Sequence, residues 1–222
     1  MPDPEKNTKP LTRIQKLIGS RMVESKLTKP HFYMQSNVDI TDIMASRRRL
    51  RKEFRVKVTT NCFYLKALAL AAVKYPLTIA TVRNENQLRV AETVNIGFAV
   101  NAPQGLVVPV VKDGDKKTLA QLANIEKDLT AHARSNNLTL EQMEGETLAL
   151  SNLGAYGIDS FFGIIPPPAT TILAVGNVTN TAVAVDGRIA SRKIISLSLA
   201  ADRRIVSDPY AAEFRGFLKN LL

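Results

Sequence analysis

Few side chains in this sequence are suited to proton transfer, nucleophilic attack or metal binding. Its 222 residues include two histidines, His31 and His132, and one cysteine, Cys62. The histidines lie far apart in the sequence and belong to no short-range metal motif. A single cysteine can form neither a disulfide within the chain nor a cysteine-rich zinc site. We therefore expect no metal site, and we interpret Cys62 as an inert thiol in an apolar helix.

Basic residues are the other chemical feature of the sequence. Lys and Arg number 30 against 20 Asp and Glu, which gives a net charge of +10. This charge suggests nucleic acid, an anionic surface or an anionic small molecule as a partner. The densest run is Arg47, Arg48, Arg49, Arg51 and Lys52. No aromatic-basic motif of an RNA- or DNA-binding module accompanies it, so we interpret it as a solvated helix face and rank nucleic acid last.

The length and hydropathy pattern indicate one domain that follows a flexible arm. A chain of this size buries roughly 70% of its unfolded surface and needs no disulfide or metal to fold. We assign residues 1–10, which include three prolines, to the arm and residues 11–222 to the domain. No run approaches the roughly 20 apolar residues of a membrane helix, and the start has no apolar signal segment. We expect a soluble, cytoplasmic protein with no membrane partner.

Helices and strands are mixed along the domain. Apolar spacing predicts a helix over 11–27 and a strand over 31–39. Thr41 is expected to cap a helix that ends near Phe54, and Thr60 or Asn61 to cap a buried helix over 63–73. Further strands are predicted over 93–100 and 106–111, and Thr118 opens the next helix.

The second half of the domain contains a loop and the longest predicted strand. A loop rich in Gly and Pro follows residue 152, and strands are predicted over 170–178, 181–185 and 188–201. Asp186 and Gly187 form a hairpin-turn signal between the last two strands. A final helix begins near Asp208, with Pro209 in its first turn. These elements predict an α/β or α+β domain with a large mixed sheet.

Four segments of the sequence carry a family resemblance when they are taken together. In chain order they are LTRIQKLIGSRMVESKLTKPHFYM, VNIGFAVNAPQGLVVPVVKD, LALSNLGAYGIDSFFGIIPPPATTILAVG and ISLSLAADRRIVSDPYAAEFRGFL. They resemble the catalytic core of the dihydrolipoamide acyltransferases, the acyl-transferring component of 2-oxo acid dehydrogenase complexes. The resemblance implies a chloramphenicol acetyltransferase-like fold, a mixed sheet flanked by helices, assembled as a homotrimer with active sites between subunits. It also implies a channel that admits coenzyme A from one side and a lipoyl arm from the other.

The resemblance implies two catalytic groups, of which this chain keeps one. Acyl transfer between thiols needs a base for the thiol proton and a donor for the oxyanion of the intermediate. The family's donor hydroxyl corresponds to Ser151. Its base is the histidine of an Asp-His-Arg-x-x-Asp-Gly motif, which here is Asp202-Arg203-Arg204-Ile205-Val206-Ser207-Asp208. Arg203 therefore stands at the histidine position and Ser207 at the aspartate position.

Arginine cannot act as the missing base. A guanidinium has no acceptor atom and keeps its proton, with a pKa above about 12. His31 matches the family's own Pro-His-Phe-Tyr strand start, beside the base position, and His132 is expected to be a solvated surface residue. Asp202 and Arg204 match the motif, and we expect them to form a structural ion pair.

Candidate contacts for coenzyme A come from two further segments. Asn152 and Gly154 follow Ser151 and are expected to shape the turn that presents it, although a loop glycine is more often only a backbone requirement. Val108 lies in a segment that the resemblance places along the channel; its alternative role is core packing. A coenzyme A partner would give the positive charge of the chain another explanation.

Two functions follow from these residues. The favoured hypothesis is a non-catalytic trimer, a scaffold or regulatory subunit that assembles with active acyltransferase cores. The alternative is an acyltransferase between coenzyme A and a thiol or other acyl carrier, with Ser151 as oxyanion donor and no histidine base. Arg203 would then favour a thiolate, a substrate carboxylate or a cofactor phosphate.

The resemblance also suggests the partners. We expect subunits of acyltransferase or dehydrogenase complexes, or a separate acyl carrier. Only ten residues precede Leu11, so we expect no lipoyl domain and no covalently bound cofactor in this chain. The sequence stops at Leu222, before the apolar extension that joins family trimers into larger shells, so we expect an isolated trimer.

Overall fold

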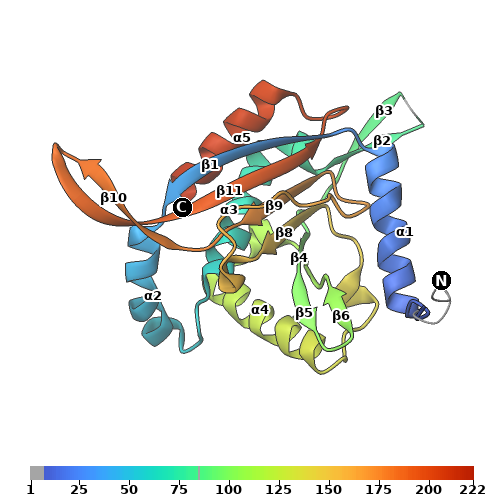
Figure 1. Cartoon of the computed structure of the whole chain (residues 1–222), viewed down its shortest axis with the longest axis horizontal. Helices are drawn as coiled ribbons and strands as arrows, with labels where there is room; N and C mark the ends of the chain where they lie inside the picture. The colour runs from blue at the N-terminus through green and yellow to red at the C-terminus, as the bar shows by residue number, and fades with distance from the viewer. Residues whose placement is uncertain (1–7, 85) are drawn as a thin grey trace, which may run out of the picture.

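A seven-stranded mixed sheet forms the centre of the computed structural model, which describes residues 8–84 and 86–222 (Figure 1). The strand order is β1-β11-β9-β8-β4-β7, and β10 pairs with β11. β4, β8 and β9 are parallel, whereas the other pairs are antiparallel. The strands are β1 (His31–Asp39), β4 (Ile96–Phe98), β7 (Val110–Val111), β8 (Leu148–Asn152), β9 (Thr171–Val175), β10 (Thr179–Val185) and β11 (Arg188–Asp202). The predicted mixed sheet is confirmed.

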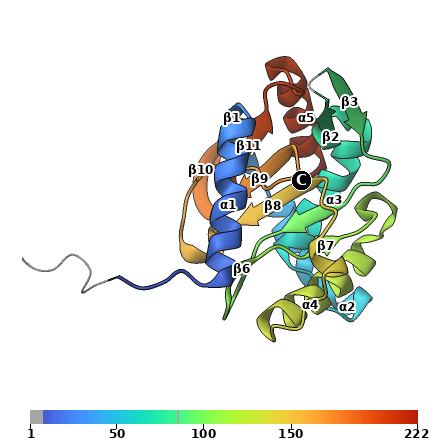
Figure 2. The ribbon, with the colours of Figure 1, turned by 90° about the vertical axis from the view of Figure 1, so that its right-hand side faces the viewer.

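The helices differ in how closely they pack against the sheet and against each other. α3 (Thr60–Lys74) is the central helix: it packs against α4 (Leu119–Arg134), α5 (Asp208–Leu221) and β8, and it buries eight of its residues. α2 (Thr41–Phe54) contacts α3 and β11. α1 (Arg13–Thr28) stands apart from this layer (Figure 2), joined to the loop before β9 by hydrogen bonds from Ser25 to Ile165 O and from Arg21 to Pro167 O.

Smaller elements complete the chain. The predicted strand over 93–100 divides into β4 and β5 (Val100–Ala102), and the one over 106–111 divides into β6 (Gly105–Val107) and β7. A hairpin of β2 (Ala80–Arg83) and β3 (Gln87–Val90) was not predicted, because each strand is only four residues long and β3 is exposed throughout. Short 3₁₀ helices are η2 (Pro76–Ile79), η3 (Gly114–Lys116), η4 (Glu141–Met143) and η5 (Gly154–Tyr156).

Helix caps are partly as predicted. Thr118 caps α4 in a reciprocal capping box with Gln121. The cap of α3 is Thr59, not Thr60 or Asn61, because the Thr59 hydroxyl accepts a hydrogen bond from the Cys62 N–H.

Thr41 is also not a cap. It is the first residue of α2, which follows Ile40 as the capping position. The Thr41 hydroxyl is used elsewhere, because it donates to Asp39 and accepts from the Lys193 N–H. The Thr41 side chain therefore joins the start of α2 to β11 instead of capping the helix.

Turns and termini agree with the sequence pattern where the structure describes them. Asp186 and Gly187 both have positive φ, 49° and 76°, in the tight turn between β10 and β11. Most of the predicted flexible arm, residues 1–7, lies outside the described residues.

Among the described residues, no helix is long and apolar enough to cross a membrane, and no cluster of three metal-ligating side chains occurs.

Candidate functional site

Ser151 lies where two cavities meet. The first cavity has a volume of about 1060 Å³ and extends between α3, α4 and the turn after β8. The second has a volume of about 520 Å³ and extends from β8 towards α1. Ser151, Ala99 and Leu106 line both. A hydroxyl in this position can donate a hydrogen bond to a group that enters from either side.

The turn after β8 sets the position of Ser151. The strand pairs Ser151 with Ala174 of β9, and the chain then turns at Asn152. The Asn152 side chain accepts a hydrogen bond from the Gly154 N–H at 2.9 Å and donates one to Asn61 Oδ1 at 2.8 Å. Asn152 therefore ties this turn to the start of α3. Both Asn152 and Gly154 line the first cavity.

The first cavity is more polar than the second and is lined by two arginines. Arg47 and Arg134 line it, together with the hydroxyls and amides of α3 and of the turn after β8. The prediction placed Arg47 on a solvated face, and this is wrong: its Nε donates to Val58 O at 3.0 Å, which turns the half-buried side chain inward. The four other basic residues of the run are exposed. Neither arginine could be assigned to a cavity from sequence, because the walls come from distant segments.

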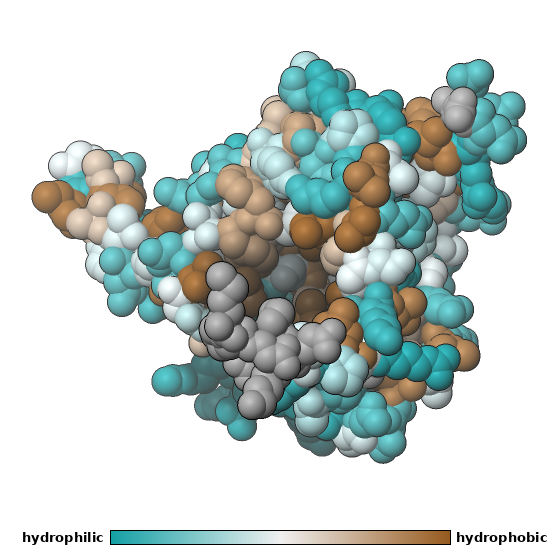
Figure 3. Space-filling model, turned by 45° about the vertical axis from the view of Figure 1, so that its right-hand side comes forward, coloured by the Kyte–Doolittle hydropathy of each residue, from teal (hydrophilic) through white to brown (hydrophobic). Residues whose placement is uncertain are grey.

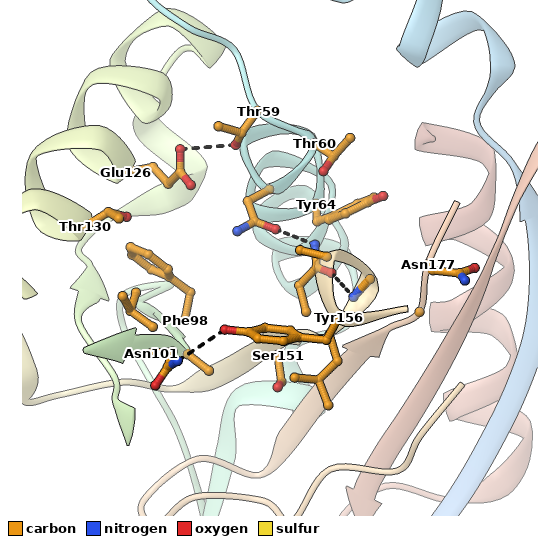
Figure 4. Close-up of a pocket in the computed structure, with 18 of the residues that line it drawn as sticks. Thr59, Thr60, Tyr64, Phe98, Asn101, Glu126, Thr130, Ser151, Tyr156 and Asn177 are labelled. Atoms are coloured by element: carbon orange, nitrogen blue, oxygen red, sulfur yellow. Dashed lines mark hydrogen bonds between the residues drawn. The ribbon is translucent and has the colours of Figure 1, made fainter. Parts of the chain in front are cut away.

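A buried carboxylate lies at the far end of the first cavity. Glu126 is 8% exposed and accepts a hydrogen bond from the Thr59 hydroxyl at 3.1 Å; the Cys62 thiol lies 3.7 Å away. Burial raises the pKa of Glu126 and that of Cys62. In Figure 4 this group is well separated from Ser151. Cys62 is wholly buried, in agreement with an inert core thiol.

The second cavity is mostly apolar. Val108 lines it rather than the first cavity, among side chains of α1 such as Leu17 and Met22. Figure 3 shows this side of the molecule, where hydrophobic residues border a hollow. Two charged residues, Arg21 and Glu146, are part of the wall.

Arg203 and Ser207 line neither cavity of the described chain. The Arg203 guanidinium forms an ion pair with Asp208, with 3.1 Å between Nη2 and Oδ2, and lies over the Phe32 ring at 5.7 Å. Ser207 occupies the capping position of α5 without a side-chain hydrogen bond. Within one chain, the structure does not bring Arg203 and Ser151 to the same cavity.

The remaining motif residues form the predicted ion pair. Asp202 is 1% exposed, and Arg204 contacts its carboxylate through Nε at 3.0 Å and Nη2 at 2.6 Å. Asp202 also accepts from the Arg204 backbone N–H. This pair stabilises the turn that follows β11.

Neither histidine is arranged to act as a base at Ser151. The Nε2 of His31 accepts from the Ile165 N–H at 3.1 Å, so Nδ1 carries the proton and donates to Lys29 O at 2.7 Å. Burial lowers the pKa of His31. His132 is exposed beside Gln142. Both therefore have the structural or solvated roles that the sequence suggested.

Comparisons of the sequence identify related proteins. The family described as 2-oxoacid dehydrogenases acyltransferase (catalytic domain) matches residues 3–222. The dihydrolipoyllysine-residue acetyltransferase component of the pyruvate dehydrogenase complex of Rickettsia bellii is 33% identical over 217 residues, and the mitochondrial one of Schizosaccharomyces pombe is 34% identical over 218. Each alignment covers 96% of this chain but only 52% or 45% of the relative. The chain thus spans about half the length of these relatives.

Solved structures share the same architecture. A probable dihydrolipoamide acetyltransferase of Listeria monocytogenes superposes with a TM-score of 0.92 at 29% identity, covering 98% of this chain and 94% of that one. The dihydrolipoamide acetyltransferase of Azotobacter vinelandii superposes equally well at 32% identity, covering 98% and 91%. Chloramphenicol acetyltransferase, with a TM-score of 0.54, 11% identity and coverage of 91% and 94%, shares the fold alone.

The Azotobacter structure comes from a study of the roles of a serine, a histidine and an asparagine in the catalytic mechanism of that enzyme. Its asparagine follows the histidine by four positions, as Ser207 follows Arg203 in this chain.

Proposed function

Because this chain belongs to the family of 2-oxoacid dehydrogenase acyltransferase catalytic domains, we propose that it is a core that binds acyl carriers without histidine-dependent transfer. Its role is that of a non-catalytic scaffold or regulatory subunit. The observation that carries the proposal is Arg203, which stands where the family motif has its base.

The surroundings of Arg203 support a structural role for this residue. Its guanidinium is paired with Asp208 and stacked on Phe32, so its charge already has partners within the chain. A guanidinium does not release its proton at neutral pH, and both ring nitrogens of His31 bind backbone groups. Loss of a general base lowers a rate by roughly 10²–10⁴-fold.

Binding has better support than catalysis. The first cavity presents Arg47 and Arg134 beside neutral donors, an arrangement that suits a phosphate-bearing arm such as that of coenzyme A. The second cavity offers an apolar route to the same serine. Coenzyme A and a separate acyl carrier would then approach Ser151 from opposite sides.

A homotrimer is part of the proposal. Arg203 lies outside the cavities of its own chain, so it would reach a Ser151 only across an interface. The proposed trimer would associate with subunits of a 2-oxo acid dehydrogenase complex. Light scattering of the purified chain should give the mass of three chains; a shell of 24 or 60 chains would contradict an isolated trimer.

A turnover assay tests the loss of chemistry. Purified protein is mixed with acetyl-CoA and dihydrolipoamide, and the product thioester is measured against a protein-free control. We expect no excess over the control, together with coenzyme A binding detected by calorimetry. Turnover well above the control would refute the non-catalytic role, and absence of coenzyme A binding would refute the retained site.

Restoring the motif gives a sharper test. The double variant Arg203→His with Ser207→Asp should gain acyl transfer of about 10²-fold or more over the wild-type background. Arg188→His is the matched control, because it introduces the same side chain at an exposed position in the hairpin. A double variant no more active than this control would show that more than the base has been lost.

The junction at Ser151 favours a second candidate, an acyltransferase that works without a base. A thiol is already a few per cent thiolate at neutral pH, and a hydroxyl between two cavities can still stabilise an oxyanion. If the wild type does turn over, Ser151→Ala should lower kcat by about 10²-fold. An unchanged kcat would place the chemistry elsewhere.

A further inference from the structure

The outer face of α2 carries exposed cations that the proposed function does not use. The helix lies at the edge of the molecule, at the lower left of Figure 1. Some of the cations belong to the helix, and the others to the turn that follows it. We call them the basic face, which consists of Arg48, Arg49, Arg51, Lys52, Arg55 and Lys57. Within the described part of the chain, none of them forms an ion pair with a carboxylate.

The cations of the basic face are crowded, which costs the isolated chain stability. Arg48 and Lys52 are four positions apart, on neighbouring turns of the helix. Arg51 and Arg55 have the same spacing, and like charges at this spacing destabilise a helix. The helix dipole favours cations in the last turn, such as Arg51 and Lys52. Arg48 and Arg49 lie further from the helix end and gain less. Helix stability therefore does not account for the basic face, which indicates a partner with negative charge.

The inner side of α2 is fixed in the core. Leu50 and Phe54 pack against a buried cluster that includes Val58 and Cys62. The helix therefore cannot rotate to present these side chains to a partner. Among the residues 41–57, all of which the structure describes, no large apolar side chain is exposed. Because a helix that lies in a membrane surface buries such side chains in the lipid, the basic face does not suit a membrane.

A nucleic acid would find only charge on the basic face. Residues 41–57 contain no Asn or Gln, and their one aromatic residue, Phe54, is packed inward. Nucleic-acid bases are recognised by side-chain amides and stack on exposed aromatic rings. Two exposed carboxylates, Asp42 and Glu53, lie on the same helix and would repel a continuous row of phosphates. A protein surface can instead place its own cations against these carboxylates.

We propose that the basic face of α2 docks a protein partner through a segment rich in Asp and Glu. Each arginine of the face can bind a carboxylate through two parallel hydrogen bonds. Arg47, on the inner side of the same helix, and Thr59, after the following turn, both line the first cavity. A docked partner would therefore lie beside that cavity. The inference goes beyond the proposed function, since it needs neither coenzyme A nor a missing base.

A set of anionic probes tests the class of partner. Fluorescein-labelled oligoglutamate and a labelled DNA duplex of equal total charge are titrated into the protein at about 50 mM NaCl, where screening is weak. Fluorescence anisotropy gives the two Kd values, and we expect that of oligoglutamate to be at least about threefold lower. A lower Kd for the duplex, or no saturable change with oligoglutamate, would overturn the proposal. Tighter binding to phosphatidylglycerol vesicles than to oligoglutamate would overturn it as well.

Charge reversal tests the location of the docking surface. Arg48→Glu combined with Lys52→Glu should raise the Kd of oligoglutamate at least about tenfold. Arg83→Glu combined with Arg188→Glu is the matched control, because it makes the same change in net charge at exposed positions of other elements. The control should keep the Kd within about twofold of the wild-type value. Equal losses in the two double variants would show that only the net charge matters, and would refute a role for the basic face.

Crosslinking maps the contact in the wild type, so it does not depend on the folding of a variant. A carbodiimide joins a lysine amine to a glutamate carboxylate that touches it, and mass spectrometry identifies the lysine. We expect oligoglutamate to be joined mainly to Lys52 and Lys57. Lys9 and Lys219 are exposed on other parts of the chain and serve as internal controls. Crosslinks that are as frequent at these two lysines would contradict docking at α2.

These experiments contain neither coenzyme A nor an acyl donor. Their outcome is therefore independent of Arg203 and of turnover, and either proposal can fail alone.

Discussion

Gly154→Ala tests how closely the turn after Ser151 packs against the rest of the site. A Cβ at this position would lie 2.6 Å from the Gly176 carbonyl oxygen and 3.1 Å from the Asn177 Cα. Both are backbone atoms, so no side-chain rotation can relieve the contact. The turn must move by about 0.8 Å for the shorter distance to reach the 3.4 Å of an ordinary contact.

The expected magnitude follows from overpacking. Forcing extra atoms into a packed region costs about 1–3 kcal/mol, and a contact with backbone belongs at the upper end. A loss of about 3 kcal/mol lowers the melting temperature of a chain of this size by roughly 6–12 °C. Because Gly154 and Asn177 both line the first cavity, coenzyme A binding should weaken as well.

Calorimetric melting of the variant and a matched control decides the result. Gly216→Ala is the control: a Cβ there meets no atom within 4 Å, and alanine is favoured over glycine inside α5 by about 0.5–1 kcal/mol. It should melt at or above the wild-type temperature. If Gly154→Ala melts with the wild type and binds coenzyme A equally well, the close approach of this turn to Gly176 is incorrect.

Three further outcomes are expected from single substitutions. Asn152→Ala removes two hydrogen bonds of the same turn, and urea unfolding should show a loss of about 1–3 kcal/mol. Arg204→Ala leaves the buried Asp202 carboxylate without its guanidinium; because Arg204 is 41% exposed, we expect a loss of about 2–4 kcal/mol, and none would contradict the pairing. Burial lowers the pKa of His31 below its ordinary 6.5, so the unfolded chain takes up this proton more readily. The stability linked to His31 is therefore present above about pH 6.5 and is lost as the pH falls towards the folded pKa. Between about pH 7.5 and 5.5 the wild type and His132→Gln should lose more stability than His31→Gln, and parallel curves would argue against a neutral His31.

Local patterns predicted the regular elements because their causes are local. The apolar spacing of α1 and α4, the alternation of β1 and the turn residues Asp186 and Gly187 each act over a few neighbouring residues. The β2–β3 hairpin was missed because its two strands have only four residues each, which is too short for an alternating pattern to stand out from the surrounding loop. The cap at Thr41 was wrong because a contact from distant β11 competes for its hydroxyl.

Some features of the candidate site could likewise be predicted from neighbouring residues, whereas others depend on distant segments. The pairing of Asp202 with Arg204 was predictable, since the residues are two apart in a recognisable motif. Arg47 was misplaced, because the inward turn of its side chain depends on the Val58 carbonyl of the following segment. Glu146 had no signal at all: its partner Arg21 is 125 positions away, and its significance comes only from burial.

Chain order alone was enough to identify the family and the mixed α/β class, and it predicts that Arg203 stands where the family motif has a histidine, because motif register and periodicity are carried by neighbouring residues. The position of Ser151 between a cavity lined by two arginines and a more apolar one became visible only in the folded chain. The fold also places Arg203 outside both cavities and buries Glu146 with no hydrogen bond to its Oε2 among the described residues. These are properties of surfaces assembled from remote segments, and burial and charge balance arise only when those segments meet.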